Sequence, residues 1–429
     1  MQRACAAALI RRGETLLQNP GHSADDKAAV SVIEALGATV QQKGDQLLIS
    51  SKGLYANGSL LVHCGESGLG MRMFTPIAAC LHHPVTVEGS GSLRSRPMQF
   101  FNEVLPSLGV MVNTTDGKLP IRVQGPLVPT TIRIDGKLSS QFLTGLLFAY
   151  SAVGASQVTI EVDGLVSKPY IDLTLSVMRS FGLPCPENHS YQRFYFSDPS
   201  KNTQQSIAGP GLSEKEDVIA ARLEYASDPL SFWVESDWSS ASFFLVAGAL
   251  AGPIRLQGLA IQSCQADRAM LQALDAAGVS HAIDAKGIIV HPSSVEPFQF
   301  DATDCPDLFP PLVALAAYAK GDTHIRGAHR LAHKESDRAL TLKNEFAKMG
   351  VLIEQEDDCL IVRGKGIVSG AVVSSCNDHR IAMALAVAAL RAEGTTEIRG
   401  AEAIKKSYPD FFADLSMLGA SLSLPDLNH

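Results

Sequence analysis

The stretch at residues 237–252 reads DWSSASFFLVAGALAG, and it decides the fold class of this chain. After a polar first turn that begins at Asp237, almost every position is apolar, whichever face of a helix it would occupy. Helices that are apolar on all sides are buried inside large proteins or membranes. Because this apolar run falls well short of the roughly 20 residues that cross a bilayer, we expect a core helix and no membrane span.

Four further stretches share this polar start and apolar body. They are SGLGMRMFTPIAAC (67–80), SSQFLTGLLFAYSAVG (139–154), DLFPPLVALAAYAKG (307–321) and NDHRIAMALAVAALRAEG (377–394). The stretch RACAAALIRRG (3–13) matches the apolar body but lacks the polar start. Ser, Asn and Asp at a helix start are ordinary N-caps, but the free N–H groups there also form a ready anion site.

A second, amphipathic kind of helix alternates with the first and ends in glycine, as ADRAMLQALDAAG does. The terminal glycines are Gly37, Gly109, Gly182, Gly278, Gly350 and Gly419, at intervals of 72, 73, 96, 72 and 69 residues. Glycine supplies the left-handed C-terminal cap of many helices, but spacing this regular indicates an internal repeat. Hairpin-like patterns follow some of these glycines, as at residues 279–291 and 351–364.

The repeats predict two similar α/β domains, residues 1–234 and 235–429, each with three copies of the repeat. The third interval is longer than its neighbours, and residues 198–231 fit as an insertion on the surface. The first repeat begins without its polar helix start and without the strand that should precede it. We therefore expect the chain to start in the middle of a repeat.

Composition excludes several classes of function. The 429 residues carry a formal charge of -8 and only 6% are aromatic, which disfavours a nucleic-acid binder. The eight cysteines are scattered, with neither a C-x-x-C pair nor zinc-ligand spacing. We therefore expect a cytoplasmic protein with reduced cysteines and no metal, which binds neither nucleic acid nor membrane.

Basic residues gather beside carboxylates and hydroxyls at expected helix starts. These stretches are residues 92–97, 333–338, 378–380 and 405–407. Each alone is most simply a solvated first turn, but their equivalent places in the repeats favour one cleft lined by Arg and Lys. Such a cleft suits a substrate with several anionic groups, because Arg pairs bidentately with phosphate and carboxylate. Asp307 and Glu335 lie amid this charge and are candidates for general acid and base catalysis.

The same stretches resemble the 5-enolpyruvylshikimate-3-phosphate synthase family, in order and at the family's spacing. They are GESGLGMRMFTP, EGSGSLRSRPM, GKLSSQFLTGLL, VSKPYIDLTLSVMRSFG, VESDWSSASFFL, HKESDR, NDHRIAMALAVAAL and IKKSYPDFF. The resemblance covers essentially the whole chain. It implies two domains, each of three βαβαββ repeats around buried helices, an arrangement called an inside-out α/β barrel.

The resemblance also implies a reaction. The enolpyruvyl group of phosphoenolpyruvate would pass to the 5-hydroxyl of shikimate 3-phosphate with release of phosphate, in the shikimate pathway to chorismate and aromatic amino acids. It implies no metal or organic cofactor, and a monomer. Closure of two domains on the cleft would exclude water and orient the two substrates.

Site residues follow from the resemblance position by position. Shikimate 3-phosphate would be held by Arg3, Ser139, Ser140, Gln141, Ser167, Tyr170, Asp307, Arg330 and Lys334. Phosphoenolpyruvate would be held by Gly68, Arg96, Gln141, Arg338, His379, Arg380 and Lys406. Asp307 matches the proton acceptor for the 5-hydroxyl, and Glu335 matches the proton donor to the methylene carbon.

Three departures from the family pattern stand out. Glu66 and Arg330 occupy positions where the family commonly has Asn. Arg3 fits the last residue of the family's S-K-S-x-x-x-R motif, whose S-K-S would precede Met1. Two explanations are open: Met1 is an internal methionine of a longer chain, or the chain is naturally shortened. In the second case it would be a weak enzyme or an inactive relative that binds shikimate 3-phosphate.

A sister family, the UDP-N-acetylglucosamine enolpyruvyl transferases, shares the fold and the donor substrate. Its members carry a reactive cysteine in a P-G-G-C-type loop, which has no match in this sequence. Cys64 and Cys80 flank the corresponding region in apolar surroundings. We expect them to be core thiols, so the resemblance favours shikimate 3-phosphate as the acceptor.

Overall fold

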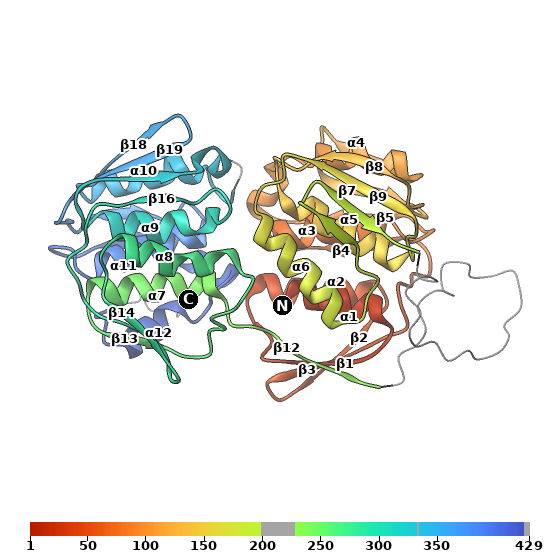
Figure 1. Ribbon diagram of the computed structural model, residues 1–429, viewed down its shortest axis with the longest axis horizontal. Helices are drawn as coiled ribbons and strands as arrows, with labels where there is room; N and C mark the ends of the chain where they lie inside the picture. Colours follow the sequence, from red (N-terminus) through yellow and green to blue (C-terminus); the bar gives the residue numbers. More distant parts are fainter. Residues whose placement is uncertain (199–227, 333, 424–429) are drawn as a thin grey trace, which may run out of the picture. The chain divides into compact units, whose positions relative to one another are not determined.

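The computed structural model describes residues 1–198, 228–332 and 334–423 (Figure 1). The chain divides into two compact units, Met1–Val234 and Glu235–His429. Both units mix helices with β-sheets, so the predicted α/β class is confirmed.

Three four-stranded sheets are described in the first unit, in the orders β12-β1-β3-β2, β4-β5-β7-β6 and β10-β11-β9-β8. The strands are β1 (Gly13–Gln18), β2 (Thr39–Lys43), β3 (Gln46–Ser51), β4 (Leu60–His63), β5 (Val85–Glu88), β6 (Met111–Thr115), β7 (Lys118–Gln124), β8 (Ile132–Asp135), β9 (Val158–Asp163), β10 (Glu187–His189), β11 (Arg193–Phe196) and β12 (Leu230–Trp233). Each sheet combines one parallel pair with antiparallel partners. A parallel pair needs a crossover connection, usually a helix, as the repeat requires.

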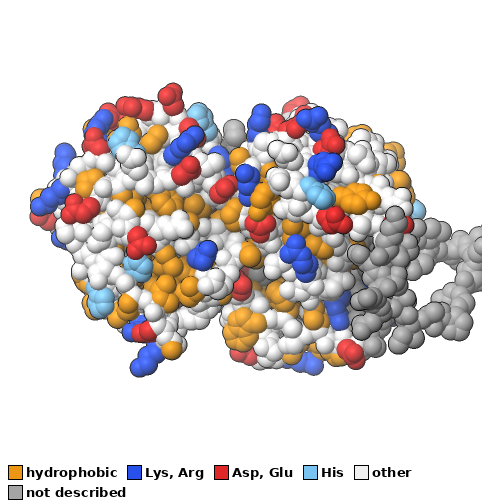
Figure 2. All heavy atoms as spheres, in the orientation of Figure 1, with side chains coloured by type: hydrophobic (Ala, Val, Ile, Leu, Met, Phe, Trp, Pro, Cys, Tyr) orange, Lys and Arg blue, Asp and Glu red, His pale blue; other side chains and the backbone are white. Residues whose placement is uncertain are grey.

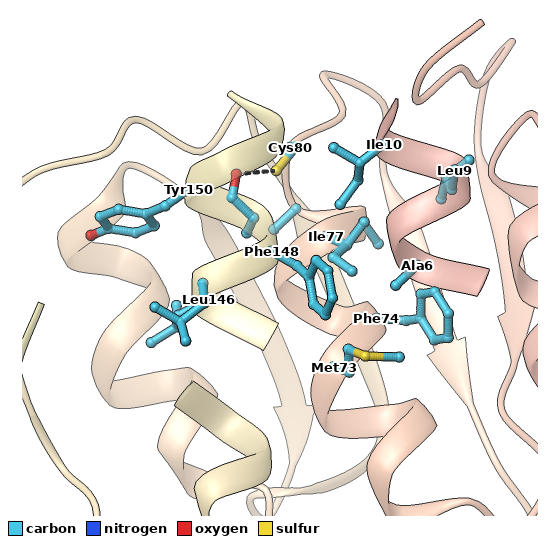
Figure 3. Packing of buried hydrophobic residues seen from close by; sticks show 14 of the residues in the cluster. Ala6, Leu9, Ile10, Met73, Phe74, Ile77, Cys80, Leu146, Phe148 and Tyr150 are labelled. Atoms are coloured by element: carbon cyan, nitrogen blue, oxygen red, sulfur yellow. Dashed lines mark hydrogen bonds between the residues drawn. The ribbon is translucent and has the colours of Figure 1, made fainter. Parts of the chain in front are cut away.

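The helices of the first unit are of the two expected kinds. They are α1 (Gln2–Arg11), α2 (Ala24–Ala35), α3 (Gly68–Ala78), α4 (Gln99–Val104), α5 (Ser140–Ala152) and α6 (Lys168–Ser180), with short 3₁₀ helices η1 (Gly91–Ser95) and η2 (Leu105–Leu108). The apolar helices α1, α3 and α5 pack against one another in the core. Figure 3 shows Ile10, Ile77 and Phe148 from these three helices converging, each at most 2% exposed.

The second unit also has three sheets among the described residues, one of four strands and two smaller ones, in the orders β13-β15-β14, β16-β17-β19-β18 and β20-β21. The strands are β13 (Ile254–Leu256), β14 (His281–Asp284), β15 (Gly287–Val290), β16 (Gln299–Asp301), β17 (Lys320–Arg326), β18 (Leu352–Glu356), β19 (Cys359–Lys365), β20 (Val372–Ser374) and β21 (Glu397–Arg399). The helices are α7 (Trp238–Leu250), α8 (Met270–Ala276), α9 (Phe309–Ala316), α10 (Arg338–Lys348), α11 (His379–Ala389) and α12 (Phe411–Met417), with 3₁₀ helices η5 (Ala266–Ala269), η6 (Pro306–Leu308), η7 (Ala328–Leu331) and η8 (Ala401–Lys406). The apolar helices α7, α9 and α11 pack together.

The repeat glycines behave as predicted. All six have a positive φ, between 66° and 109°, a conformation that costs glycine little because it has no Cβ. The hairpins expected at residues 279–291 and 351–364 are present as β14–β15 and β18–β19. Terminal glycines therefore end each amphipathic helix and turn the chain toward the next segment.

Three expectations about elements need correction. The helix expected over 307–321 begins as η6, and α9 ends at Ala316, because β17 already starts at Lys320. Arg96 is not in the first turn of a long helix but directly follows η1, and Pro106 breaks the expected helix into α4 and η2 because proline has no backbone N–H. The expected insertion at 198–231 is too long by its last two residues, which belong to β12, and its residues 199–227 lie outside the described chain.

Two further expectations concern membrane-spanning helices and the thiols of Cys64 and Cys80. Within the described residues, no helix combines the length and apolar character needed to cross a membrane. Cys64 and Cys80 are core thiols as expected: both are buried, and burial raises the pKa of each to about 12.

Gly145 sets the distance between two buried helices. It lies on α5, and a Cβ added there would stand 2.5 Å from the Arg72 carbonyl oxygen and 3.0 Å from Met73 Cα on α3. Gly145→Ala should therefore force α3 and α5 apart and lower the free energy of unfolding by about 1–3 kcal/mol. Urea unfolding followed by circular dichroism measures this, with Gly252→Ala as control because nothing lies within 4 Å of its added Cβ. Equal losses in the two variants would contradict the prediction.

Candidate active site

In the first unit, two buried arginines meet at the start of α3. Ser67 caps this helix by accepting a hydrogen bond from the Gly70 N–H at 3.0 Å. A Cβ placed on Gly68 would lie 2.6 Å from Arg96 Nη1 and 3.1 Å from Arg72 Nη1. The two guanidinium groups therefore approach the same point on the helix backbone, where the positive end of the helix dipole also lies.

The start of α5 joins this group. Ser139 is the N-cap of α5, and its hydroxyl accepts a hydrogen bond from the Gln141 N–H at 3.2 Å. The Gln141 side-chain oxygen accepts a hydrogen bond from Arg72 Nη1 at 2.8 Å. Ser140 is buried beside them. The first unit thus brings Gly68, Arg96 and the Ser139–Gln141 segment together.

The remaining predicted residues of the first unit are Ser167 and Tyr170 at the start of α6, and Arg3 on α1, which contacts α6. Arg3 Nε donates to Thr174 Oγ1 at 2.9 Å, and Arg3 Nη2 lies 3.5 Å from the Tyr170 carbonyl oxygen. Thr174 also lies 3.1 Å from the hydroxyl of Thr144 on α5, so hydroxyl contacts connect α1, α5 and α6. Ser167 precedes α6 with φ 57°, which is uncommon for a residue with a side chain. Burial lowers the pKa of Arg3 to about 10, so its guanidinium stays protonated at pH 7.

In the second unit, one carboxylate is shared by three cations. Asp307 Oδ1 accepts hydrogen bonds from Lys334 Nζ at 3.1 Å and from Arg338 Nη1 at 2.9 Å. Its other oxygen, Oδ2, lies 3.3 Å from Arg380 Nη2. Burial alone would raise the pKa of Asp307, but the three cations outweigh it and hold that pKa well below its usual range.

Arg338, the first residue of α10, connects this carboxylate to two more. Its side chain is fully buried. Nη2 donates to Glu335 Oε2 at 2.5 Å, while Nε and Nη2 donate to the two oxygens of Asp378 at 3.0 and 3.3 Å. Although burial opposes it, the pKa of Arg338 is raised by Asp378, Glu335 and Asp307. One guanidinium thus holds both predicted proton-transfer groups.

The remaining predicted residues of the second unit surround this group. Arg380 Nη1 donates to the Ser239 hydroxyl at the start of α7, and Lys406 Nζ donates to the Asn377 carbonyl oxygen at 2.8 Å. Arg330 Nη1 donates to the Thr303 carbonyl oxygen at 3.0 Å, and its charge acts on Lys334. His379 is buried, and burial followed by the charge of Arg380 lowers its pKa to about 4.

Sequence reasoning assigned no site role to two residues that the structure places in these groups of charged side chains, although one of them lies in the charged stretch 378–380. Arg72 lies one turn after Gly68 and contacts Gln141, and its guanidinium also lies 5.2 Å from the centre of the Phe142 ring. Asp378 was interpreted as an ordinary N-cap, which it is, but it also binds Arg338. In the sequence, Arg72 could have been noticed only as a lone arginine inside the otherwise apolar helix expected at residues 67–80.

Glu66, one of the three departures from the family pattern, directly precedes Ser67, the N-cap of α3. A Cβ placed on Gly91 would collide with Glu66 Oε2, so the carboxylate packs against the first residue of η1. Among residues 1–198, 228–332 and 334–423, no group of three or more His, Cys, Asp or Glu side chains could hold a metal ion. On the face drawn in Figure 2, basic and acidic side chains are interspersed.

Fold and clusters together define the class of this molecule: a two-unit α/β protein whose buried helices begin at groups of arginine, lysine and carboxylate side chains. A family model described as EPSP synthase (3-phosphoshikimate 1-carboxyvinyltransferase) matches residues 2–211 and 218–415. The 3-phosphoshikimate 1-carboxyvinyltransferase of Clostridium kluyveri is 34% identical over 421 residues, 98% of this chain and 92% of that protein. The protein of the same name from Methanocorpusculum labreanum is 33% identical, covering 98% and 94%. The chain belongs to the EPSP synthase family.

Solved structures show the same fold. EPSP synthase from Acinetobacter baumannii aligns with a TM-score of 0.74 at 23% identity, covering 98% of this chain and 93% of that one. The enolpyruvyl transferase NikO from Streptomyces tendae aligns with a TM-score of 0.73 at 20% identity, covering 98% and 92%. The fold predicted from the repeats is therefore confirmed.

His379 should stay neutral at pH 7. Its pKa of about 4 in the folded protein lies below the ordinary 6.5, so the unfolded chain takes up a proton first as the pH falls. Stability from this group is complete above about pH 6.5 and is lost on acidification toward pH 4. An NMR titration of the His379 ring measures the pKa, and His379→Gln should reduce the acid sensitivity of unfolding. A His379 pKa of 6.5 or higher would contradict this.

Proposed function

We propose that this protein transfers the enolpyruvyl group of phosphoenolpyruvate to the 5-hydroxyl of shikimate 3-phosphate and releases phosphate. The reaction belongs to the shikimate pathway to chorismate and aromatic amino acids. Membership of the EPSP synthase family supports it. The observation that carries it is the sharing of Arg338 between Asp307 and Glu335, because the reaction needs one proton acceptor and one proton donor close together.

In the first unit, the acceptor substrate would be bound at the starts of α5 and α6. The helix starts at Ser139–Gln141 and at Ser167 offer hydroxyl, amide and backbone N–H donors, which suit a phosphate and the hydroxyls of a ring. Arg3, near Tyr170 in the structure, adds a positive charge. From residues 235–429, Asp307, Arg330 and Lys334 would contact the ring.

The donor substrate has a phosphate and a carboxylate, and each needs neutralisation. Arg96 beside the Gly68 backbone, with Gln141, would bind one of them at the positive end of the α3 dipole. Arg338, Arg380 and Lys406 supply the cations of the second unit, and the same cations would stabilise the charged tetrahedral intermediate. His379, neutral because its pKa is about 4, would offer a hydrogen bond rather than a charge.

Asp307 becomes a useful base only when its cations are engaged elsewhere. Three cations hold its pKa well below the usual range, which makes it a weak proton acceptor while they are paired with it. An anionic substrate competes for Arg338 and Arg380, and each cation that the substrate draws away from Asp307 leaves this carboxylate with a higher proton affinity. Phosphoenolpyruvate binding would thus prepare Asp307 to take the proton of the 5-hydroxyl.

Asp307 and Glu335 would both act in the addition and again in the elimination. A proton from Glu335 reaches the methylene carbon as the 5-hydroxyl oxygen attacks the adjacent carbon, giving a tetrahedral intermediate. Glu335, now a carboxylate, would then take a proton back from the new methyl group, so that the double bond re-forms and phosphate leaves with the proton held by Asp307. The intermediate and the departing phosphate are both anionic, so the fixed guanidinium groups stabilise both steps.

We further propose that the protein works as a cytoplasmic monomer. All eight cysteines are free, and Cys5, Cys64, Cys80 and Cys305 are buried, which suits a reducing compartment. The sequence has no heptad pattern that would favour a coiled-coil oligomer.

Asp307→Asn should abolish most turnover. Removing a general base costs roughly 10²–10⁴-fold in kcat, measured as phosphate released from phosphoenolpyruvate with shikimate 3-phosphate as acceptor. Asp301→Asn is a matched control, because Asp301 is an exposed carboxylate that accepts a local hydrogen bond from the Thr303 N–H. Turnover by Asp307→Asn equal to that of this control would remove Asp307 from the mechanism.

The same assay tests the function itself. Phosphate release by the unmodified protein with shikimate 3-phosphate supports the proposal. Binding of shikimate 3-phosphate without release would identify an inactive relative. Release only with UDP-N-acetylglucosamine as acceptor would assign the chain to the sister reaction and overturn the proposal.

Gly68→Ala should weaken phosphoenolpyruvate binding with little effect on stability. The added methyl group would stand 2.6 Å from Arg96 Nη1, and the end of a long side chain can move away at low cost. Since Arg96 would then be misplaced, KM for phosphoenolpyruvate should rise about tenfold or more while KM for shikimate 3-phosphate changes little. Gly70→Ala is the control on the same helix, because its methyl group meets the Ser67 side chain instead. An equal rise in both variants would contradict the role of Arg96.

A further inference from the structure

Asp378 is a buried carboxylate that the proposed chemistry does not use. It is the N-cap of α11 and accepts a hydrogen bond from the Arg380 N–H at 3.0 Å. A cap alone needs no charge, since Asn serves as well as Asp at this position of a helix. The side chain is nevertheless fully buried as a carboxylate, and burying a charge is costly unless it is paired.

Both oxygens of Asp378 contact the Arg338 guanidinium. Oδ2 accepts from Nε at 3.0 Å and Oδ1 accepts from Nη2 at 3.3 Å, a two-point contact that fixes the plane of the guanidinium as well as its position. The Ser336 hydroxyl also donates to Oδ2, at 3.1 Å. Burial would raise the pKa of Asp378, but Arg338 outweighs it and keeps the carboxylate ionised.

The orientation set by Asp378 determines what the rest of Arg338 can reach. While Nε and Nη2 donate to Asp378, Nη1 donates to Asp307 and Nη2 also donates to Glu335. We propose that Asp378 is the positioning residue of this site: it orients Arg338 and balances its charge, so that an anionic substrate can compete with Asp307 and Glu335 for the N–H groups of the guanidinium. The identity of the anion that Arg338 binds rests on the proposed function, whereas the contact between Asp378 and Arg338 does not.

Loss of the Asp378 charge should change catalysis in a specific way. Without it, Arg338 has only Asp307 and Glu335 as charged partners and pairs with them more strongly. Phosphoenolpyruvate then competes less well for the guanidinium. The charged and titratable groups that face Asp378 are Arg338 on α10, Glu335 before it, and His379 on its own helix, with Asp307, Lys334 and Arg380 around them. Removing a negative charge lowers the proton affinity of the neighbouring carboxylates.

The test is Asp378→Asn, which keeps the cap and removes the charge. We expect kcat/KM for phosphoenolpyruvate to fall roughly 100-fold, as for other buried pairs broken on one side. KM for shikimate 3-phosphate should change little, and both limbs of the pH profile of kcat should move to lower pH. Asp337→Asn is the matched control: Asp337 caps α10 through the Leu340 N–H, directly before Arg338, and is exposed. It should behave like the unmodified protein.

A double variant separates positioning from a general structural role. If Asp378 acts through Arg338, the Asp378→Asn change should cost much less in an Arg338→Lys background than in the unmodified protein. An equal cost in both backgrounds would overturn the proposal. Should Asp378→Asn fail to fold, Ser336→Ala loosens the same carboxylate and should shift the same parameters, by a smaller amount. No shift in that variant would also overturn the proposal.

A further measurement does not depend on the reaction. The Arg338 Nε–H, buried and bonded to a carboxylate, should give a slowly exchanging NMR signal in arginine-labelled protein, assigned by its loss in Arg338→Lys. Asp378→Asn should move or remove this signal, and Asp337→Asn should leave it in place. If the unmodified protein releases no phosphate, the proposed function fails while this signal still tests the contact. An unchanged signal in Asp378→Asn would refute the positioning role.

Discussion

The described part of the second unit depends on one buried guanidinium, that of Arg338. Four hydrogen bonds run from its nitrogens to Asp307, Glu335 and Asp378. These carboxylates come from separate segments: η6, the loop before α10, and the start of α11. A buried ion pair seldom adds net stability, because desolvation offsets the attraction. What the Arg338 contacts supply is geometry, since a planar guanidinium fixes the relative positions of the three carboxylates.

Apolar helices and charged clusters have a common origin in this fold. A helix such as α11 is buried along nearly its whole length, so the N–H groups of its first turn open into the interior rather than into bulk water. Those donors need acceptors, and Asp378 and Ser67 supply them for α11 and α3. The same buried helix starts concentrate a positive potential, which is where anions bind. The charged side chains of the site therefore gather at the starts of core helices such as α3 and α11.

Much of this arrangement could be predicted from the sequence. The six terminal glycines and the apolar helices follow from local rules of capping and periodicity, which need no tertiary information. The ends of the elements were less predictable, because they depend on the neighbouring elements. For example, α9 ends at Ala316 because β17 begins at Lys320. The roles of Asp378 and Arg72 were not predictable in the same way. A capping aspartate looks alike in sequence whether or not a distant arginine reaches it, and only the packing of α10 beside α11 makes that contact.

The group of charged side chains around Arg338 shows why net charge is a poor guide to what a protein binds. Its three carboxylates, Asp307, Glu335 and Asp378, balance the cations Lys334, Arg338 and Arg380, in a chain whose formal charge is -8. In the proposed function, anion binding would work by exchange of partners: an incoming phosphate or carboxylate would compete for cations that are paired with carboxylates in the structure. Those carboxylates would gain proton affinity as they lose their cationic partners. The ion pairs that balance the buried cations would therefore also couple substrate binding to proton transfer.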